Sequence, residues 1–163
     1  MKIIAFDQST TATGWAVLKQ DTAQIVESGV IKPKGETNDR IIQTVKKCLW
    51  LVEEFQVAFI FIEGVQYQKN AKVLQILAKL AGTLEIMLIE KGYFVNVVKA
   101  SEWRRRVGVK GRRRADVKKE AHKLVKEIYD IEAPEDEVEA ILFARAFTDI
   151  PIKKTNIADA IKK

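Results

Sequence analysis

The segment that most constrains the fold is an unbroken apolar run at residues 57–62, VAFIFI, which ends at Glu63. The run is rich in β-branched and aromatic residues and has no polar position, so a strand formed by it must be covered on both faces. Strands of this kind belong to parallel or mixed sheets whose faces are packed by helices. The run therefore predicts an α/β architecture with a layered core.

The rest of the chain predicts four more strands and four helices around this run. Alternating apolar positions and β-branched residues predict strands at residues 2–6, 13–18, 24–31 and 93–98, the first three as an antiparallel meander. Helical spacing predicts helices at residues 41–55 and 70–90, one beginning near Arg113 and one beginning at Pro134 as a first-turn proline. This order predicts a mixed five-stranded sheet flanked by helices.

The size and composition of the chain indicate one globular unit. A chain of 163 residues fits a single domain, predicted at residues 1–150, followed by a short basic tail at residues 151–163. Cys48 is the one cysteine and falls among apolar residues at helical spacing, so we expect it to be buried and unreactive. The apolar stretch before Asp7 is too short for a signal peptide or a membrane span, which predicts a cytoplasmic protein without membrane association.

The positive charge of the chain is concentrated in one segment. Residues 99–126 contain 12 Lys or Arg and three acidic residues, a local charge of +9, whereas the whole chain carries +6. A basic segment in an otherwise mildly acidic chain predicts a polyanionic partner such as nucleic acid, because each neutralised phosphate releases condensed counterions. The alternative is that these side chains form only a solvated helix face.

Four carboxylates are candidates for a shared site. Asp7 ends the first predicted strand and Glu63 ends the fourth, so both would emerge at one edge of the sheet if these strands are parallel neighbours. Asp136 and Glu139 are three positions apart and lie on one face of the last predicted helix. The alternatives are a turn or capping role for each strand-end acid, and a favourable interaction with the helix macrodipole for the last two.

If these carboxylates converge, they require a cation, because crowded acids repel one another and resist ionisation. Oxygen ligands without histidine or thiolate favour Mg²⁺, with Mn²⁺ as a substitute. The one histidine, His122, falls beside an apolar stripe and is expected at a helix surface, which disfavours zinc. Two such ions can activate a water and stabilise the leaving oxygen of a phosphodiester, so the pattern predicts nucleic-acid hydrolysis without a small-molecule cofactor.

Three segments together resemble the RuvC family of Holliday-junction resolvases, which have a ribonuclease-H-like fold. The segments are residues 7–14 (DQSTTATG), residues 62–65 (IEGV) continued by residues 69–71 (KNA), and residues 136–140 (DEVEA). They occur in the family's order over residues 3–148. The resemblance implies a metal-dependent, structure-specific endonuclease that binds four-way and other branched DNA, with two ions in each active site.

The resemblance also implies a homodimer that makes paired nicks, and it assigns roles to individual residues. Asp7, Glu63, Asp136 and Glu139 would be catalytic metal ligands, and Arg114 would be the basic side chain beside the metals. DNA contacts are expected at Tyr67, Lys69, Arg104, Arg105, Arg106, Lys110, Arg112, Arg113 and Lys118. The helix at residues 70–90 has an apolar face, formed by Val73, Leu77, Leu80, Leu84 and Met87, that is a hypothetical dimer contact, and Gly82 within it predicts close packing against a neighbour.

The chain departs from the family's pattern at two places. Position 139 is Glu where the family usually has Asp, so a longer carboxylate must reach the metal. Gln66 and Tyr67 occupy the loop in which the family often presents an aromatic wedge, which predicts relaxed junction selectivity that extends to forks and flaps. Tyr67 can stack on an exposed base, or it can be an ordinary packing residue.

Other functions remain open at this point. A DNA-binding protein of the same fold with weak or lost catalysis would share the basic segment, with Glu139 as the reason for the loss. A nuclease acting on RNA hybrids would share the carboxylates. An ATPase of the actin-like superfold begins with a similar Asp and Thr-rich turn, but it needs a duplicated domain and more glycine-rich loops than eight glycines in 163 residues supply.

Overall fold

The protein is built on a five-stranded mixed sheet. The computed structural model describes residues 1–151, and most of the predicted basic tail, residues 152–163, lies outside the described residues. The strands are β1 (Lys2–Asp7), β2 (Thr13–Lys19), β3 (Ile25–Ile31), β4 (Phe59–Glu63) and β5 (Val95–Val98). In the sheet order β3-β2-β1-β4-β5, the first three strands pair antiparallel, whereas β1 pairs parallel with β4 and β4 with β5. The predicted mixed sheet is confirmed.

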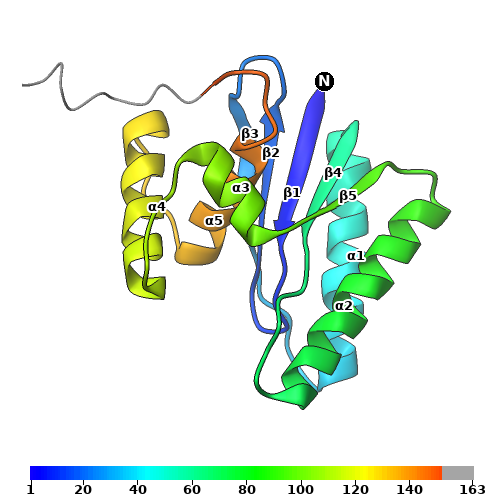
Figure 1. Ribbon diagram of the computed structural model, residues 1–163. Helices are drawn as coiled ribbons and strands as arrows, with labels where there is room; N and C mark the ends of the chain where they lie inside the picture. The colour runs from blue at the N-terminus through cyan, green and yellow to red at the C-terminus, as the bar shows by residue number, and fades with distance from the viewer. Residues whose placement is uncertain (152–163) are drawn as a thin grey trace, which may run out of the picture.

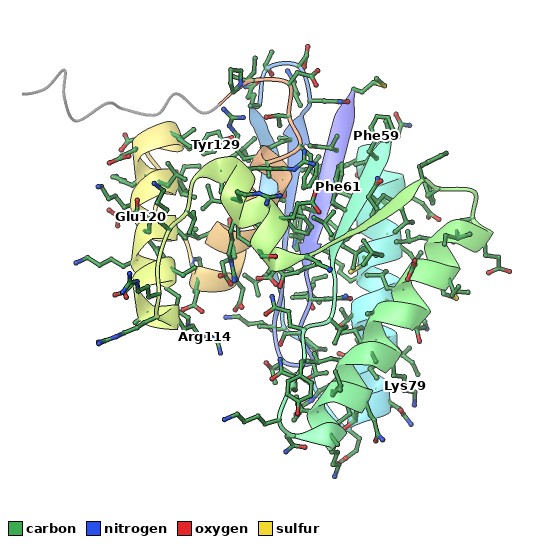
Figure 2. The ribbon with its side chains drawn as sticks, viewed as in Figure 1. Phe59, Phe61, Lys79, Arg114, Glu120 and Tyr129 are labelled. Carbon is green, nitrogen blue, oxygen red and sulfur yellow. The ribbon has the colours of Figure 1, made fainter. Side chains whose placement is uncertain are left out.

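Helices cover both faces of the sheet (Figure 1). Helices α1 (Thr37–Phe55) and α2 (Ala71–Glu90) pack on one face, and α3 (Ala100–Val107), α4 (Arg114–Tyr129) and α5 (Glu135–Arg145) pack on the other. Successive residues of β1 alternate between the two layers, because Ile4 faces α1 and α2 whereas Ile3 and Ala5 face α5. Phe59 and Phe61 of β4 belong to the second layer (Figure 2). The run at residues 57–62 is thus covered on both sides, as its composition predicts.

Helix α3 is the element that the sequence pattern missed. Its apolar stripe is only Ala100, Trp103 and Val107, and three consecutive arginines fill its last turn, so the charge pattern dominates the segment. Those arginines lie where the helix macrodipole favours cations, and Gly108, with φ of +80°, ends the helix in the left-handed conformation. The basic segment therefore contains a short helix packed on the core by one face.

Two smaller expectations can be compared with the structure. Pro134 caps α5, which begins one residue later than predicted. Cys48 is fully buried, as predicted, and burial raises the pKa of its thiol well above the ordinary value. No helix within residues 1–151 is both long and apolar enough to cross a membrane. The domain boundary near residue 150 and the cytoplasmic location stay predictions.

Two glycines differ sharply in the space around them. A side chain at Gly14 of β2 would place its Cβ 1.9 Å from the backbone oxygen of Asp136, so only glycine lets the first turn of α5 approach the sheet there. A Cβ at Gly82 of α2 would meet no atom within 4 Å, so the predicted close approach at Gly82 does not occur within the described residues. Gly14 therefore sets where α5 begins relative to the end of β1.

We predict that Gly14→Ala costs about 1 to 3 kcal/mol of unfolding free energy, since an overpacked site forces the backbone to shift. Gly82→Ala is the matched control and should stabilise the chain by roughly 0.5 to 1 kcal/mol, because alanine is the better residue in a helix interior. Urea denaturation followed by circular dichroism measures both changes. A Gly14→Ala protein as stable as its parent would contradict the proposed constraint on α5.

Candidate active site

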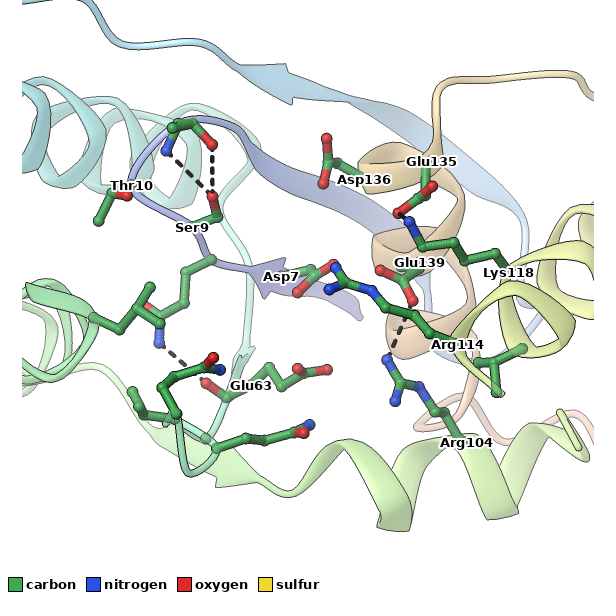
Figure 3. A pocket seen from close by; sticks show the side chains of 18 of the residues that line it. Asp7, Ser9, Thr10, Glu63, Arg104, Arg114, Lys118, Glu135, Asp136 and Glu139 are labelled. Carbon is green, nitrogen blue, oxygen red and sulfur yellow. Dashed lines mark hydrogen bonds and ion pairs between the residues drawn. The ribbon is translucent and has the colours of Figure 1, made fainter. Parts of the chain in front are cut away.

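The carboxyl ends of β1 and β4 form one side of a cavity. The parallel register pairs Phe6 with Ile62, so Asp7 and Glu63, the next residues of the two strands, emerge at the same edge of the sheet. Figure 3 shows both side chains directed into a common space, which Glu139 enters from α5. The cavity has a volume of about 670 Å³, and Asp136 lines it as well. The structure thus brings together the four acids singled out from the sequence.

The N-terminal turn of α5 supplies the second pair of acids because it lies over the sheet at Gly14. Asp136 and Glu139 are on one face of this turn, as their spacing predicts. Glu135 and Glu137 share the turn but make other contacts: Glu135 pairs with Lys118 at 2.5 Å, and Glu137 accepts a hydrogen bond from the Ser28 hydroxyl at 2.6 Å. Glu135, Asp136 and Glu139 all line the cavity, which a purely dipole-stabilising role does not explain.

The loop after β1 is held in shape by its own threonine and serine. Thr13 is fully buried, and its hydroxyl donates to the Ser9 backbone oxygen at 3.0 Å while accepting from the Ser9 amide at 3.2 Å. The loop residues Ser9, Thr10 and Thr11 line the cavity beside Asp7. The Thr-rich segment at residues 7–14 therefore fixes the direction in which the chain leaves β1.

The environment of Asp7 makes its ionised form unfavourable. Burial is the largest cause that raises the pKa of the Asp7 carboxyl well above its ordinary value, followed by the negative charges of Glu63, Glu139 and Asp136. Burial also raises the pKa of Asp136, with further contributions from Glu135 and Glu139. The predicted crowding of carboxylates is present, and a cation placed among them would relieve it.

Two of the four acids already have partners on α3. The indole nitrogen of Trp103 donates a hydrogen bond to Glu63 Oε2 at 2.6 Å, and Arg104 Nη2 lies 3.2 Å from Glu139 Oε1. Burial raises the pKa of Glu63, but the Trp103 hydrogen bond and the Arg104 charge oppose that rise. Sequence analysis did not identify Trp103 as a site residue, because α3 itself was not predicted.

The donor set fits a hard divalent cation, since all four side chains offer oxygen. Within residues 1–151, however, no three His, Cys, Asp or Glu side chains stand close enough to form a ready metal cluster. Arg104 on α3 lies 3.2 Å from Glu139 Oε1, so it competes with a metal ion for this carboxylate. Metal binding would therefore require Glu139 to exchange its Arg104 partner for the cation.

The predicted basic residues divide into two groups. Arg104, Arg112, Arg113, Arg114 and Lys118 line the cavity, and Figure 3 shows Arg114 reaching toward Asp7 and Glu139. The others lie elsewhere: Arg106 pairs with Glu102 at 2.9 Å, and Arg105, Lys69 and Lys110 are exposed. Tyr67 is 83% exposed and lines a neighbouring hollow with Val97 and Lys99. His122 is exposed on α4, as predicted.

A family model described as crossover junction endodeoxyribonuclease RuvC matches residues 3–147. Among solved structures, the chain is similar to a Thermus thermophilus RuvC in complex with Holliday junction substrate, with a TM-score of 0.74 at 14% identity over 90% of this chain and 92% of the other. It is also similar to a fowlpox virus resolvase in complex with Holliday junction DNA, with a TM-score of 0.58 at 11% identity over 90% and 93% of the two chains.

A third similar structure is the yeast mitochondrial Holliday junction resolvase, with a TM-score of 0.60 at 14% identity over 89% of this chain and 76% of the other. No curated protein matches the chain by sequence. At these identities the solved structures establish a shared ribonuclease-H-like fold, whereas the family model covers nearly the whole described chain.

The raised pKa of Asp7 gives a testable dependence of stability on pH in the absence of metal. The unfolded chain ionises Asp7 near the ordinary aspartate pKa of about 3.9, whereas the folded chain keeps the proton to a higher pH. The folded state then binds more protons than the unfolded state, so the free energy of unfolding falls as pH rises through this window. Asp7→Asn removes this loss.

We therefore predict that Asp7→Asn melts at least about 2 °C above its parent at pH 7 in EDTA, the change that corresponds to about 1 kcal/mol in a chain of this size. The difference should disappear near pH 3, and differential scanning fluorimetry measures it. Asp21→Asn, at an exposed position between β2 and β3, is the matched control and should leave the melting temperature unchanged. An Asp7→Asn protein that melts below its parent at pH 7 would refute the assignment.

Proposed function

The chain belongs to the RuvC family of crossover junction endodeoxyribonucleases, and on that premise we propose that it nicks four-way and other branched DNA by metal-dependent hydrolysis of a phosphodiester. The observation that carries the proposal is the meeting of Asp7, Glu63 and Glu139 in one cavity that is also lined by arginines. Acids alone would suit many metal sites. Acids under a rim of guanidinium groups suit a substrate that brings phosphates to the metal.

Asp7, Glu63, Asp136 and Glu139 would hold Mg²⁺, for which Mn²⁺ can substitute. Two such ions, when bound, supply an activated water and stabilise the charge on the leaving oxygen. The fold of the chain positions these ligands: β1 fixes Asp7 and β4 fixes Glu63. Gly14 lets α5 lie close enough to the sheet for its acids to line the same cavity. The longer side chain of Glu139 already reaches the cavity, which supports a ligand role for it.

The arginines of the cavity would act on the phosphate. Arg114, at the start of α4, points toward the carboxylates and would stabilise the negative charge that develops on the reacting phosphate. Arg112 and Arg113 precede it in an exposed loop and would bind neighbouring phosphates without reading sequence. Arg104 now pairs with Glu139, and a cation that takes over Glu139 would free Arg104 to bind the DNA backbone.

A second candidate, a branched-DNA-binding protein with weak or lost catalysis, is favoured by one observation. The Arg104–Glu139 ion pair, only 14% exposed at Glu139, supplies internally the positive charge that a metal would otherwise provide. If this pair were more stable than the metal complex, the basic rim would still bind DNA but no nick would follow. The carboxylates do not distinguish ribose from deoxyribose. The experiment below therefore also tests for cleavage of RNA–DNA hybrids.

A four-way junction, a fork, a linear duplex and an RNA–DNA hybrid of matched sequence test these alternatives, each with Mg²⁺, Mn²⁺ or EDTA. We expect paired nicks in the four-way junction with either metal, slower nicking of the fork, and no cleavage in EDTA. Asp7→Asn should bind the junction yet lose cleavage, whereas Asp21→Asn should cleave like the parent. Binding without cleavage by the parent would establish the second candidate, and preferred cleavage of the hybrid would overturn the DNA assignment.

We further propose that the active protein is a homodimer, since paired nicks on one junction require two active sites. The predicted contact on α2 needs revision in its details. Leu80, Leu84 and Leu88 are fully buried against the sheet, and Leu77 lines the active-site cavity, so they are not free to form an interface. Ile86 and Ile89, 64% and 49% exposed, lie one turn apart near the end of α2 and are the better candidates.

A charge at this position tests the interface. Ile86→Glu should shift the protein from dimer to monomer in sedimentation velocity, because a buried unpaired carboxylate opposes association. Its own fold should persist, since Ile86 is exposed in the single chain. Gln24→Glu adds the same charge at an exposed position between β2 and β3, outside α2, and this variant should remain dimeric. An Ile86→Glu protein that still sediments as a dimer would exclude this face as the contact.

A further inference from the structure

Trp103 is a core residue that also touches the active site. Its side chain is 1% exposed, yet its indole nitrogen donates to Glu63 Oε2 at 2.6 Å. Glu63 is the last residue of β4, and its carboxylate opens into the cavity that Asp7 and Glu139 share. A single hydrogen bond therefore joins the hydrophobic core beneath α3 to one of the candidate metal ligands.

The position of the donor is fixed by packing. The Trp103 ring lies against the fully buried ring of Phe143 on α5, with centroids 5.7 Å apart and an angle of 27° between the planes. Phe143 in turn packs against Phe61 of β4 at 6.5 Å. Rings held in this way have little freedom to rotate. The direction of the indole N–H is thus set jointly by α3, α5 and β4.

This geometry leaves Glu63 with two different oxygens. Oε2 accepts a hydrogen bond from the indole, whereas Oε1 has no hydrogen-bond partner within residues 1–151. The backbone of the same residue is also held, because the Gln8 side-chain amide donates to the Glu63 carbonyl oxygen at 3.0 Å. Both the strand end and the rotamer of Glu63 are therefore constrained before any ligand arrives.

A buried indole N–H needs an acceptor in any protein, so packing alone would explain a bond to a backbone carbonyl. The acceptor here is a carboxylate, and a bond to an ionised group is roughly twice as strong as a neutral one. Its length of 2.6 Å agrees with a charge-assisted bond. The pairing orients a carboxylate that lines the cavity, which a purely structural role for Trp103 does not require.

We propose that Trp103 is a positioning residue that fixes Glu63 Oε2 and thereby presents Oε1 to the divalent cation. The inference rests on the proposed metal-dependent function, but it concerns this chain's own hydrogen bond and can be tested without DNA. Groups that orient metal ligands in this way typically change metal affinity by about 10- to 100-fold when removed. Trp103 is expected to have an effect of that size while contributing no atom to the reacting phosphate.

The first test is Trp103→Phe, which keeps an aromatic ring against Phe143 but removes the N–H. We expect Mn²⁺, titrated calorimetrically without DNA, to bind about 10- to 100-fold more weakly. We also expect kcat on the junction to fall while KM changes little, because phenylalanine keeps an aromatic ring beside Arg104, whose guanidinium carbon lies 5.1 Å from the Trp103 ring centroid. Trp50→Phe is the control, since Trp50 is 47% exposed on α1 beneath Lys47. Equal Mn²⁺ affinity in Trp103→Phe and its parent would overturn the proposal.

The second test is independent of how well Trp103→Phe folds. The three tryptophans give three indole N–H signals in a ¹⁵N-correlated NMR spectrum, and the Trp103 signal should lie downfield because its acceptor is charged. Glu63→Gln supplies a neutral acceptor and should move this signal upfield, leaving those of Trp15 and Trp50 in place. Mg²⁺ should shift the same signal in the parent. A Trp103 signal indifferent to Glu63→Gln would overturn the proposal.

The two proposals fail in distinguishable ways. Absence of cleavage by the parent in every metal would remove the nuclease assignment but would not affect the Mn²⁺ titration or the indole signal. Conversely, a parent that nicks junctions normally while Trp103→Phe binds Mn²⁺ and cleaves equally well would leave the nuclease assignment intact. In that case the bond to Glu63 would be only a way of satisfying a buried donor.

Discussion

The parallel pairing of β1 with β4 is the constraint on which the active site depends. It places Asp7 and Glu63 at one edge of the sheet, and the two buried faces of these strands require a layer of helices on each side. On one of those faces, α5 can lie close to the sheet only because Gly14 has no side chain. The site is thus a product of strand direction and close helix packing together.

Gathering the acids has a cost that the surrounding residues reduce. Burial and mutual repulsion make the ionised form of Asp7 unfavourable, and a carboxylate left alone in such a place would favour its neutral form. At Glu63, the Trp103 hydrogen bond and the Arg104 charge, from consecutive residues of α3, oppose the rise in pKa that burial causes. The folded chain therefore keeps crowded negative charge that a divalent cation can neutralise, beside arginines that a phosphate backbone can bind. The clustering of carboxylates that lowers the stability of the fold is the same clustering that metal binding requires.

Residue patterns were sufficient to predict most of the fold and the four acidic residues of the site. Alternation and apolar runs located all five strands, and helical spacing located α1, α2, α4 and α5, because these elements bury stripes long enough to be recognised. Helix α3 escaped because its stripe has only three apolar residues among arginines. The same omission concealed Trp103, and it left Arg104 as one of several basic residues expected on the DNA side rather than as a partner of Glu139.

The sequence by itself determined which side chains the chain can offer: acids at the ends of two strands, two more on one helical turn, and a basic segment between them. Those features depend on spacing along the chain, because the regular geometry of a helix or strand fixes the side to which each residue points. Tertiary structure alone decided which cations meet which acids, because Arg104 and Glu139 or Trp103 and Glu63 are brought together by packing between distant elements. It also decided which apolar side chains of α2 are buried and which remain exposed, since that depends on how the helix is rotated against α1 and the sheet.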